Sequence, residues 1–283
     1  MKRMRIYAPQ VGSVSKHYTE VKTATLDFAA RFGFVTQSIF FDYLCPLQKT
    51  QKYLYWSQLK REGLIEPSRQ YFEDVCYLTR RGRHQAPRWA VPSRSIYFVD
   101  HDATVARLYL ELEQSGLLLS SFTEYELRSD KYEAFKLLGG DSEKYPDLLV
   151  DMKTPDSFLR IAVEVERSRK SNERYALMSL RYFGLRHVDL MLFCCCDRAT
   201  GRAIEHQFNA EVYRKAEKIP TIFLISDFKK SGVLAEAKFL ERRMTLKKLL
   251  LAALDQTEWG NGKNVENSRN RVHENFIDEK KCA

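Results

Sequence analysis

The sequence has 283 residues, of which 44% are hydrophobic, and a net charge of +9 at pH 7. This length allows one large or two modest domains, and the lack of a run of about 18 apolar residues excludes a membrane-spanning helix. The charged start is not followed by an apolar stretch, so we expect no signal peptide. Six Cys without a Cys-x-x-Cys pair fit a reducing compartment. We therefore expect a cytoplasmic protein with no membrane partner.

The positive charge is concentrated in the first third of the chain. Residues 1–98 hold 16 Lys/Arg against 7 Asp/Glu, whereas the remaining 185 residues hold 30 of each. Such a concentration is the electrostatic footprint expected where a protein meets phosphate. It favours nucleic acid as the partner of this region. The alternative is a basic surface that only keeps the protein in solution.

Residues 1–98 predict three short helices followed by two short strands. The expected elements are a polar arm over 1–20, helices over 25–32, 37–44 and 50–62, and strands over 64–67 and 75–79. Thr36 is an expected N-cap and Gly63 an expected helix stop. This order is typical of a winged helix-turn-helix domain. A small packing module that binds protein is the alternative.

The third helix of this domain is expected to turn apolar residues inward and basic residues outward. The expected inward residues are Tyr53, Leu54, Trp56 and Leu59. The candidate DNA contacts of the domain are Lys49, Lys52, Lys60, Arg61, Arg80, Arg81, Arg83 and Arg88. Basic side chains bind phosphate without reading sequence, so these residues predict a backbone contact surface.

A connector over 84–98 leads to a second, mixed α/β domain over 99–254. Its expected elements are a helix over 104–114, an apolar run over 117–122, strands over 146–151 and 158–166 joined by a turn at 154–157, a basic helix reaching 183, a strand over 188–196, a helix over 204–215, a strand over 221–225 and a helix over 234–254. The polar tail over 255–283 is expected to be disordered.

Three carboxylates stand out in the second domain. Asp147 lies near the start of one strand, and Glu164 and Glu166 share a face of the next because side chains alternate along a strand. If the two strands pair, the three groups can converge, and clustered oxygen ligands suit Mg²⁺ or Mn²⁺. The alternatives are a strand-start cap for the aspartate and ion pairs of the glutamates with Arg160 and Arg167.

Basic residues follow these carboxylates. Lys170 is a candidate catalytic residue at the head of the basic helix, or else a phosphate contact beside Arg169 and Arg174. Earlier in the domain, Glu126 is a further candidate carboxylate, with a slight preference over Glu124.

Asp147 after Pro146, followed by Glu164-Val165-Glu166, resembles the PD-(D/E)xK nuclease core, with Glu166 in place of the usual lysine. The segments LKREGLIEP, YLTRRGR, HDATVARLYLEL, FTEYELRS, PDLLVD and VEVERSRKSNERYALMSLRYF together resemble plasmid replication-relaxation proteins and MobC-type mobilisation relaxases, over roughly residues 50 to 195. The resemblance implies a restriction-endonuclease-like PD-(D/E)xK core behind the winged helix.

The same resemblance implies metal-dependent nicking of DNA at a plasmid transfer origin during mobilisation. The implied partner is double-stranded plasmid DNA with a single-stranded region at the nick, together with other mobilisation or replication proteins. Two other functions stay open: a non-catalytic DNA-binding accessory or replication regulator on a nuclease-like scaffold, and a restriction or defence nuclease.

Overall fold

The computed structural model describes residues 14–68, 75–88, 90–93, 95–116, 118–140, 144–153, 158–208, 220–239, 242–248 and 250. The chain is mixed α/β and forms two compact units, Met1–Leu110 and Glu111–Ala283. Their boundary lies inside helix α5 (Ile96–Gln114), whereas the sequence placed it at residue 98. No described helix has the length and apolar content needed to cross a bilayer. The predicted tail over 255–283 lies outside the described residues.

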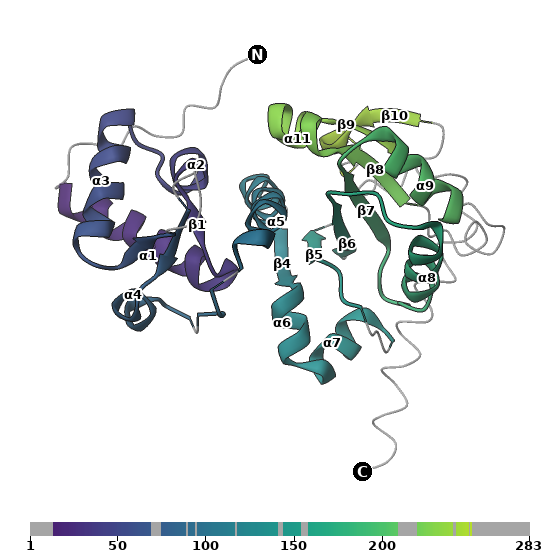
Figure 1. The fold of residues 1–283 in the computed structure, drawn as a ribbon, viewed down its shortest axis with the longest axis horizontal. Helices are drawn as coiled ribbons and strands as arrows, with labels where there is room; N and C mark the ends of the chain where they lie inside the picture. The colour runs from purple at the N-terminus through teal and green to yellow at the C-terminus, as the bar shows by residue number, and fades with distance from the viewer. Residues whose placement is uncertain are drawn as a thin grey trace, which may run out of the picture. The chain divides into compact units, whose positions relative to one another are not determined.

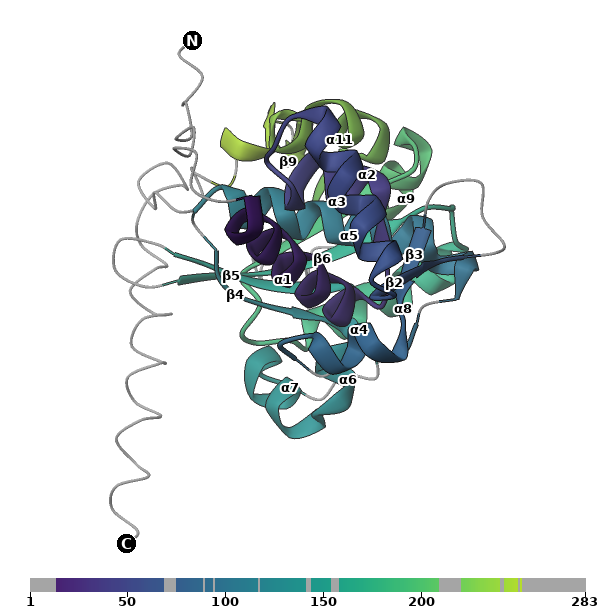
Figure 2. The same ribbon diagram turned by 90° about the vertical axis from the view of Figure 1, so that its left-hand side faces the viewer.

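The first unit is built from helices and a small antiparallel sheet. Its elements before α5 are α1 (Val14–Phe32), β1 (Val35–Thr36), α2 (Gln37–Ile39), the π-helical turn η1 (Phe40–Leu44), α3 (Lys49–Arg61), β2 (Ile65–Pro67), β3 (Val75–Leu78) and α4 (Arg80–Gln85). The strand order is β1-β3-β2. Helix α1 lies between α3 and α4 (Figures 1 and 2). Its buried aromatic residues join those of η1 and α3 in one core.

The helix starts of this unit follow the sequence in part. Thr36 caps α2 as predicted, because its side chain accepts a hydrogen bond from the N–H of Ile39 at 3.1 Å. Helix α1, however, begins at Val14, so the predicted arm is wrong from that residue on. Tyr18 and Val21 are buried and extend the apolar face toward the N-terminus.

Helix α3 is turned differently from the prediction. Trp56 and Leu59 are buried as expected, but Tyr53 and Leu54 are exposed, and Tyr55 is buried in their place. Positions 55, 56 and 59 form one helical face, so a rotation of the helix by part of a turn explains the difference.

The basic run after β3 forms helix α4. Thr79 caps it by accepting a hydrogen bond from the N–H of Gly82 at 3.0 Å. A Cβ atom at Gly82 would lie 2.0 Å from the carbonyl oxygen of Leu64, so only glycine lets the helix approach the backbone before β2 this closely.

The second unit is a mixed sheet with helices. After α5 its elements are β4 (Leu118–Thr123), α6 (Glu124–Ser129), α7 (Lys131–Leu138), β5 (Leu148–Lys153), β6 (Phe158–Glu166), α8 (Asn172–Phe183), β7 (Leu190–Cys195), α9 (Arg198–Phe208), β8 (Pro220–Leu224), α11 (Ile225–Ser231), the 3₁₀ turn η2 (Gly232–Leu234), β9 (Glu236–Phe239) and β10 (Arg242–Thr245). The strand order is β10-β9-β8-β7-β6-β5-β4. Strands β6, β7 and β8 are parallel to one another, and the other neighbours are antiparallel.

One face of this sheet is covered by α8 and α9 (Figure 1). Both helices connect parallel strands, and successive right-handed crossovers in one direction place their helices on the same face. The predicted helix over 234–254 is wrong in its first part, where β9 and β10 form a hairpin at the sheet edge. Charged residues are tolerated in this hairpin because only one face of a strand at the sheet edge is buried. Ala235 and Ala237 are buried, and Glu236 between them is exposed.

Candidate active site

The two strands that carry the predicted carboxylates pair in antiparallel fashion. Leu148 lies opposite Val163, which places Asp147, one residue before β5, next to Glu164. The Oδ2 atom of Asp147 accepts a hydrogen bond from the backbone N–H of Val165 at 2.7 Å. The structure therefore brings the predicted aspartate beside the first of the two predicted glutamates.

Glu164 is buried, with 2% of its surface exposed, and two side chains hold its carboxylate. It accepts hydrogen bonds from the hydroxyl of Tyr182 on α8 and from the ammonium group of Lys144, in the segment before β5. Burial raises the pKa of Glu164 to about 7; the charge of Asp147 adds to this effect, and Lys144 opposes it. With this pKa, the carboxyl group changes between its protonated and ionised forms near neutral pH.

Lys144 and Tyr182 were not among the predicted site residues. Burial alone would lower the pKa of Lys144, but Glu164 and Asp147 outweigh it and raise that pKa, so the lysine stays charged. Burial, followed by the charge of Glu164, raises the pKa of Tyr182 well above its ordinary value, so the phenol stays protonated and its hydroxyl donates a hydrogen bond to Glu164. One signal in the sequence could have found Tyr182, since it lies two turns after Tyr175 on the buried face of α8.

Glu166 has its own partner. It is 1% exposed, and the ammonium group of Lys170 lies 2.6 Å from its Oε1 atom. The backbone N–H of Lys170 donates to the hydroxyl of Tyr175 at 3.1 Å, and Ser171 then caps α8. These bonds place Lys170 at the head of the basic helix, reaching back to the end of β6.

Glu126 has a local structural contact. Its Oε2 atom accepts a hydrogen bond from the N–H of Thr123 at 2.7 Å, which completes a capping box at the start of α6. Glu124, which the sequence analysis ranked slightly lower, has a closer link to the carboxylate pair. Its backbone N–H donates to the carbonyl oxygen of Asp147 at 3.2 Å, and its carboxylate pairs with Arg128 at 2.7 Å.

A second buried acid–base pair occupies the other end of the same strand face. Asp151 and Arg160 are opposite each other in the register and form two hydrogen bonds, of 2.7 and 2.9 Å. Ser120 donates a third hydrogen bond to this aspartate at 2.7 Å. Within the described residues, Arg160 thus pairs with Asp151. The alternative in which Arg160 forms an ion pair with Glu164 or Glu166 is wrong.

The donor set has the chemistry of a site for a hard divalent cation, but its geometry is incomplete. Asp147 and Glu164 offer carboxylate oxygens from adjacent strands, which Mg²⁺ and Mn²⁺ prefer. A cation beside them would also offset the burial and the like charge that raise the pKa of Glu164. Across the part of the chain that the structure describes, however, no three acidic, His or Cys side chains are gathered as a metal-binding group. Glu166 remains with Lys170.

The candidate DNA contacts of the first unit differ in their surroundings. Those with exposed side chains are Lys49, Arg61, Arg80, Arg81, Arg83 and Arg88. Arg88 is held by Asp27 through two hydrogen bonds, of 2.6 and 2.9 Å. Lys52 donates to a backbone carbonyl, and the ammonium group of Lys60 lies 5.1 Å from the centre of the Trp56 ring. In the second unit, Arg169 and Arg174 are exposed at the start of α8.

Comparison of the chain with protein-family models, with curated proteins and with solved structures gave no match in any of the three.

Proposed function

We propose that the second unit is a metal-dependent DNA nicking module and that the first unit binds duplex DNA at a plasmid transfer origin. The placement of Asp147 beside Glu164 carries this proposal, because two acids meet on neighbouring strands where burial makes an uncompensated charge costly. The element order α5-β4-α6-α7-β5-β6-α8-β7 supports it, because it sets Asp147 just before β5 and Glu164 near the end of β6, the two motif positions on which the resemblance to the PD-(D/E)xK core rests.

In this proposal each polar residue of the site has a separate task. A divalent cation held by Asp147 and Glu164 would polarise the scissile phosphate and generate hydroxide from bound water. Tyr182 fixes the orientation of Glu164 by its hydrogen bond. Lys144 and Lys170 supply positive charge on either side of the strand end, in place of the lysine for which this chain has a glutamate at 166.

The first unit contributes charge and a DNA-binding architecture to the proposal. Its helices, its short first strand and its β2–β3 hairpin follow the order of a winged helix-turn-helix domain. Helix α3 then takes the place of the recognition helix, with Lys49 and Arg61 exposed at its two ends. Arg80, Arg81 and Arg83 on α4 add phosphate contacts.

A second candidate function is a non-catalytic DNA-binding accessory on the same scaffold. The observation that favours it is the pairing of each buried glutamate with an ammonium group, Glu164 with Lys144 and Glu166 with Lys170. Such pairs neutralise the acids without a metal ion.

Nicking of supercoiled plasmid that carries the cognate origin separates the two functions. The full chain is incubated with Mg²⁺, Mn²⁺ or EDTA, and the conversion of supercoiled to open-circular DNA is measured. We expect cleavage with either metal, none in EDTA, and none with Glu164→Gln. The matched control is Glu133→Gln, which changes an exposed glutamate of α7 in the same unit. Equal rates for wild type, Glu164→Gln and Glu133→Gln would exclude the nuclease function and favour the non-catalytic accessory function.

Duplex binding by the first unit has its own test. Replacing Arg80 and Arg81 by Ala should weaken duplex affinity and reduce the slope of log K against log salt by about 0.9 for each lost contact. Arg186→Ala is the control, because it removes a positive charge from an exposed position of the second unit. An unchanged slope in the double variant would exclude α4 from the interface.

A further inference from the structure

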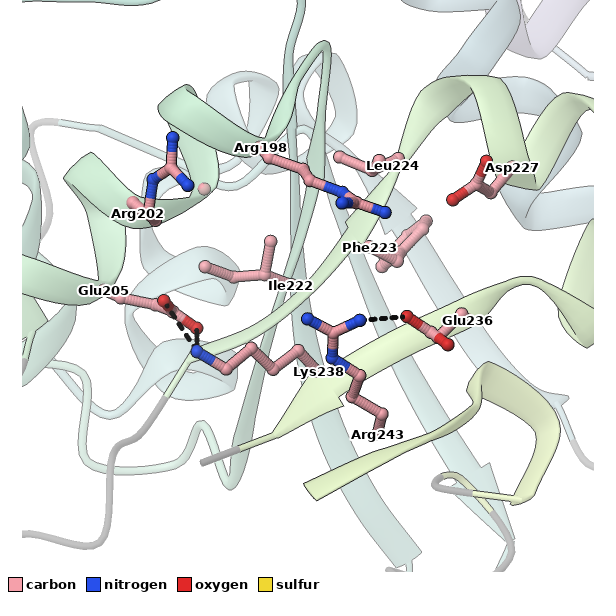
Figure 3. A pocket seen from close by; sticks show the side chains of 11 residues that line it. Arg198, Arg202, Glu205, Ile222, Phe223, Leu224, Asp227, Glu236, Lys238 and Arg243 are labelled. Atoms are coloured by element: carbon pink, nitrogen blue, oxygen red, sulfur yellow. Dashed lines mark hydrogen bonds and ion pairs between the residues drawn. The ribbon is translucent and has the colours of Figure 1, made fainter. Parts of the chain in front are cut away.

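A second candidate site lies beside the parallel strands, away from the carboxylate pair. It is a half-open pocket with a cavity volume of about 170 Å³ (Figure 3). Ile222 and Leu224 of β8 line it from the sheet, and Arg198 and Arg202 line it from α9. Asp227 of α11 lies at its rim.

The strand register explains how the sheet side of the pocket is made. Ile222 pairs with Lys238 on β9, and Lys238 pairs with Arg243 on β10, so the three side chains form a row across three strands. Helix α9 lies close above this row because Gly201 has no side chain there: a Cβ atom would meet Ile222 at 2.9 Å. The result is a narrow space with an apolar floor, surrounded by four basic and three acidic side chains.

One arginine of the pocket, Arg198, has no ion-pair partner among the described residues. Two of the pocket's four basic residues are already paired, Lys238 with Glu205 at 3.0 Å and Arg243 with Glu236 at 3.3 Å. The guanidinium group of Arg198, by contrast, makes no hydrogen bond or ion pair with any described residue. Its guanidinium and that of Arg243 both extend into the centre of the pocket (Figure 3).

The position of the pocket in the fold is one where α/β proteins bind ligands. Helix α9 begins just after the carboxyl end of β7, and α11 begins at the carboxyl end of β8. Crevices outside the carboxyl ends of parallel strands are common ligand sites. The register aligns Glu166, Cys195 and Leu224 in one row along this edge. Two strand spacings, roughly 10 Å, therefore separate the pocket from Glu166.

We propose that this pocket binds a phosphate group of the DNA strand that the carboxylate site acts on, a proposal that rests on the function proposed above. Guanidinium groups bind phosphate through paired N–H donors, and Arg198 together with Arg243 presents two of them to one space. The volume suits a single phosphate group, because sites for drug-sized molecules usually exceed about 300 Å³.

Binding of a short fluorescent single strand to the full chain in EDTA tests this inference without any cleavage. Arg198→Gln and Arg243→Gln should each weaken binding roughly tenfold, because each removes a charged hydrogen-bond donor from the phosphate. Each should also reduce the slope of log K against log salt by about 0.7. Both side chains lie at the surface, so the variants should unfold at the wild-type temperature. Strand affinities equal to wild type in both variants would overturn the proposal.

The controls separate this site from the proposed chemistry. Arg186→Gln removes the same charge from an exposed position of the second unit and should bind the strand like wild type. Glu164→Gln should abolish nicking. Adding Arg198→Gln to this variant should still weaken strand binding, so the pocket proposal can be tested even if the protein does not nick DNA. In a further arm, inorganic phosphate is titrated against wild type and Arg198→Gln. Phosphate binding that needs Arg198, with strand binding that does not, would assign the pocket to a small phosphorylated ligand and overturn the strand proposal.

Discussion

Two buried polar clusters lie on the same face of the β5–β6 pair, one at each end. At one end Asp151 and Arg160 face each other, and at the other Asp147 lies beside Glu164. Between them, Leu149 pairs with Ala162 in the apolar core under α8. The two clusters therefore share the same pair of strands and are both buried, and they differ in how their charges are arranged.

The arrangement of charges separates a structural pair from a candidate site. Asp151 receives both donors of the Arg160 fork and a hydroxyl, so one acid is matched by one base in bidentate geometry. Glu164 shares its surroundings with a second acid, and burial together with Asp147 raises its pKa to about 7. Crowded acids with a raised pKa are typical of sites that bind cations or transfer protons.

The largest expected difference between the clusters is in catalysis. Asp147→Asn should lower the rate of plasmid nicking on the order of a thousand-fold or more, because it removes a carboxylate that the cation needs, worth several kcal/mol. Asp151→Asn, an identical change four residues further along the same strand face, should leave the rate within a few-fold. Rates are measured on supercoiled plasmid at a temperature where both variants are folded. Equal losses would mean that the two clusters have the same role.

The next difference is in stability, where a change in the Asp151–Arg160 cluster should have the larger effect. Asp151→Ala should lower the free energy of unfolding by about 3–5 kcal/mol, because it leaves the Arg160 charge buried without a partner. Glu164→Gln should change it by about 1 kcal/mol or less at pH 8, since the loss of a crowded charge offsets the loss of the Lys144 pair. Urea denaturation in EDTA measures both values. A larger loss in Glu164→Gln would reassign that residue to a structural pair.

The pH dependence of stability sharpens the same contrast. The pKa of Glu164 rises from 4.5 to about 7 on folding, so the folded protein holds this proton more tightly than the unfolded chain does. Its contribution to stability is fully present below about pH 4.5 and is lost as the pH rises through about 7, on the order of 3 kcal/mol in all. Relative to Glu164→Gln, the metal-free wild type should therefore become less stable from pH 5 to pH 8. Parallel pH curves for the two proteins would show that Glu164 is not crowded.

The sequence predicted the strand that links the two clusters better than it predicted their chemistry. The apolar run ending in Glu166 gave β6 with the observed ends, because a buried strand carries its signal in every residue. Lys144 gave no such signal, since it lies in an irregular segment and meets Glu164 only through the tertiary fold. The hairpin of β9 and β10 was also missed, because short charged edge strands have weak local preference and are fixed by their pairing with β8.

The smallest expected effect concerns Lys170, the ammonium group at the rim of the site. Its side chain is 28% exposed, but its partner Glu166 is only 1% exposed, so Lys170→Ala leaves a buried carboxylate without its ion pair and should lower the free energy of unfolding by about 1–3 kcal/mol. The same change should slow nicking roughly tenfold to a hundredfold, because it removes one charged donor from the phosphate path. Duplex affinity should change by less, since Lys170 is one of many basic groups. Arg169→Ala is the matched control: this exposed neighbour should affect affinity at least as much as rate. Equal losses of rate and affinity in Lys170→Ala would make this lysine a phosphate clamp that carries no part of the chemistry.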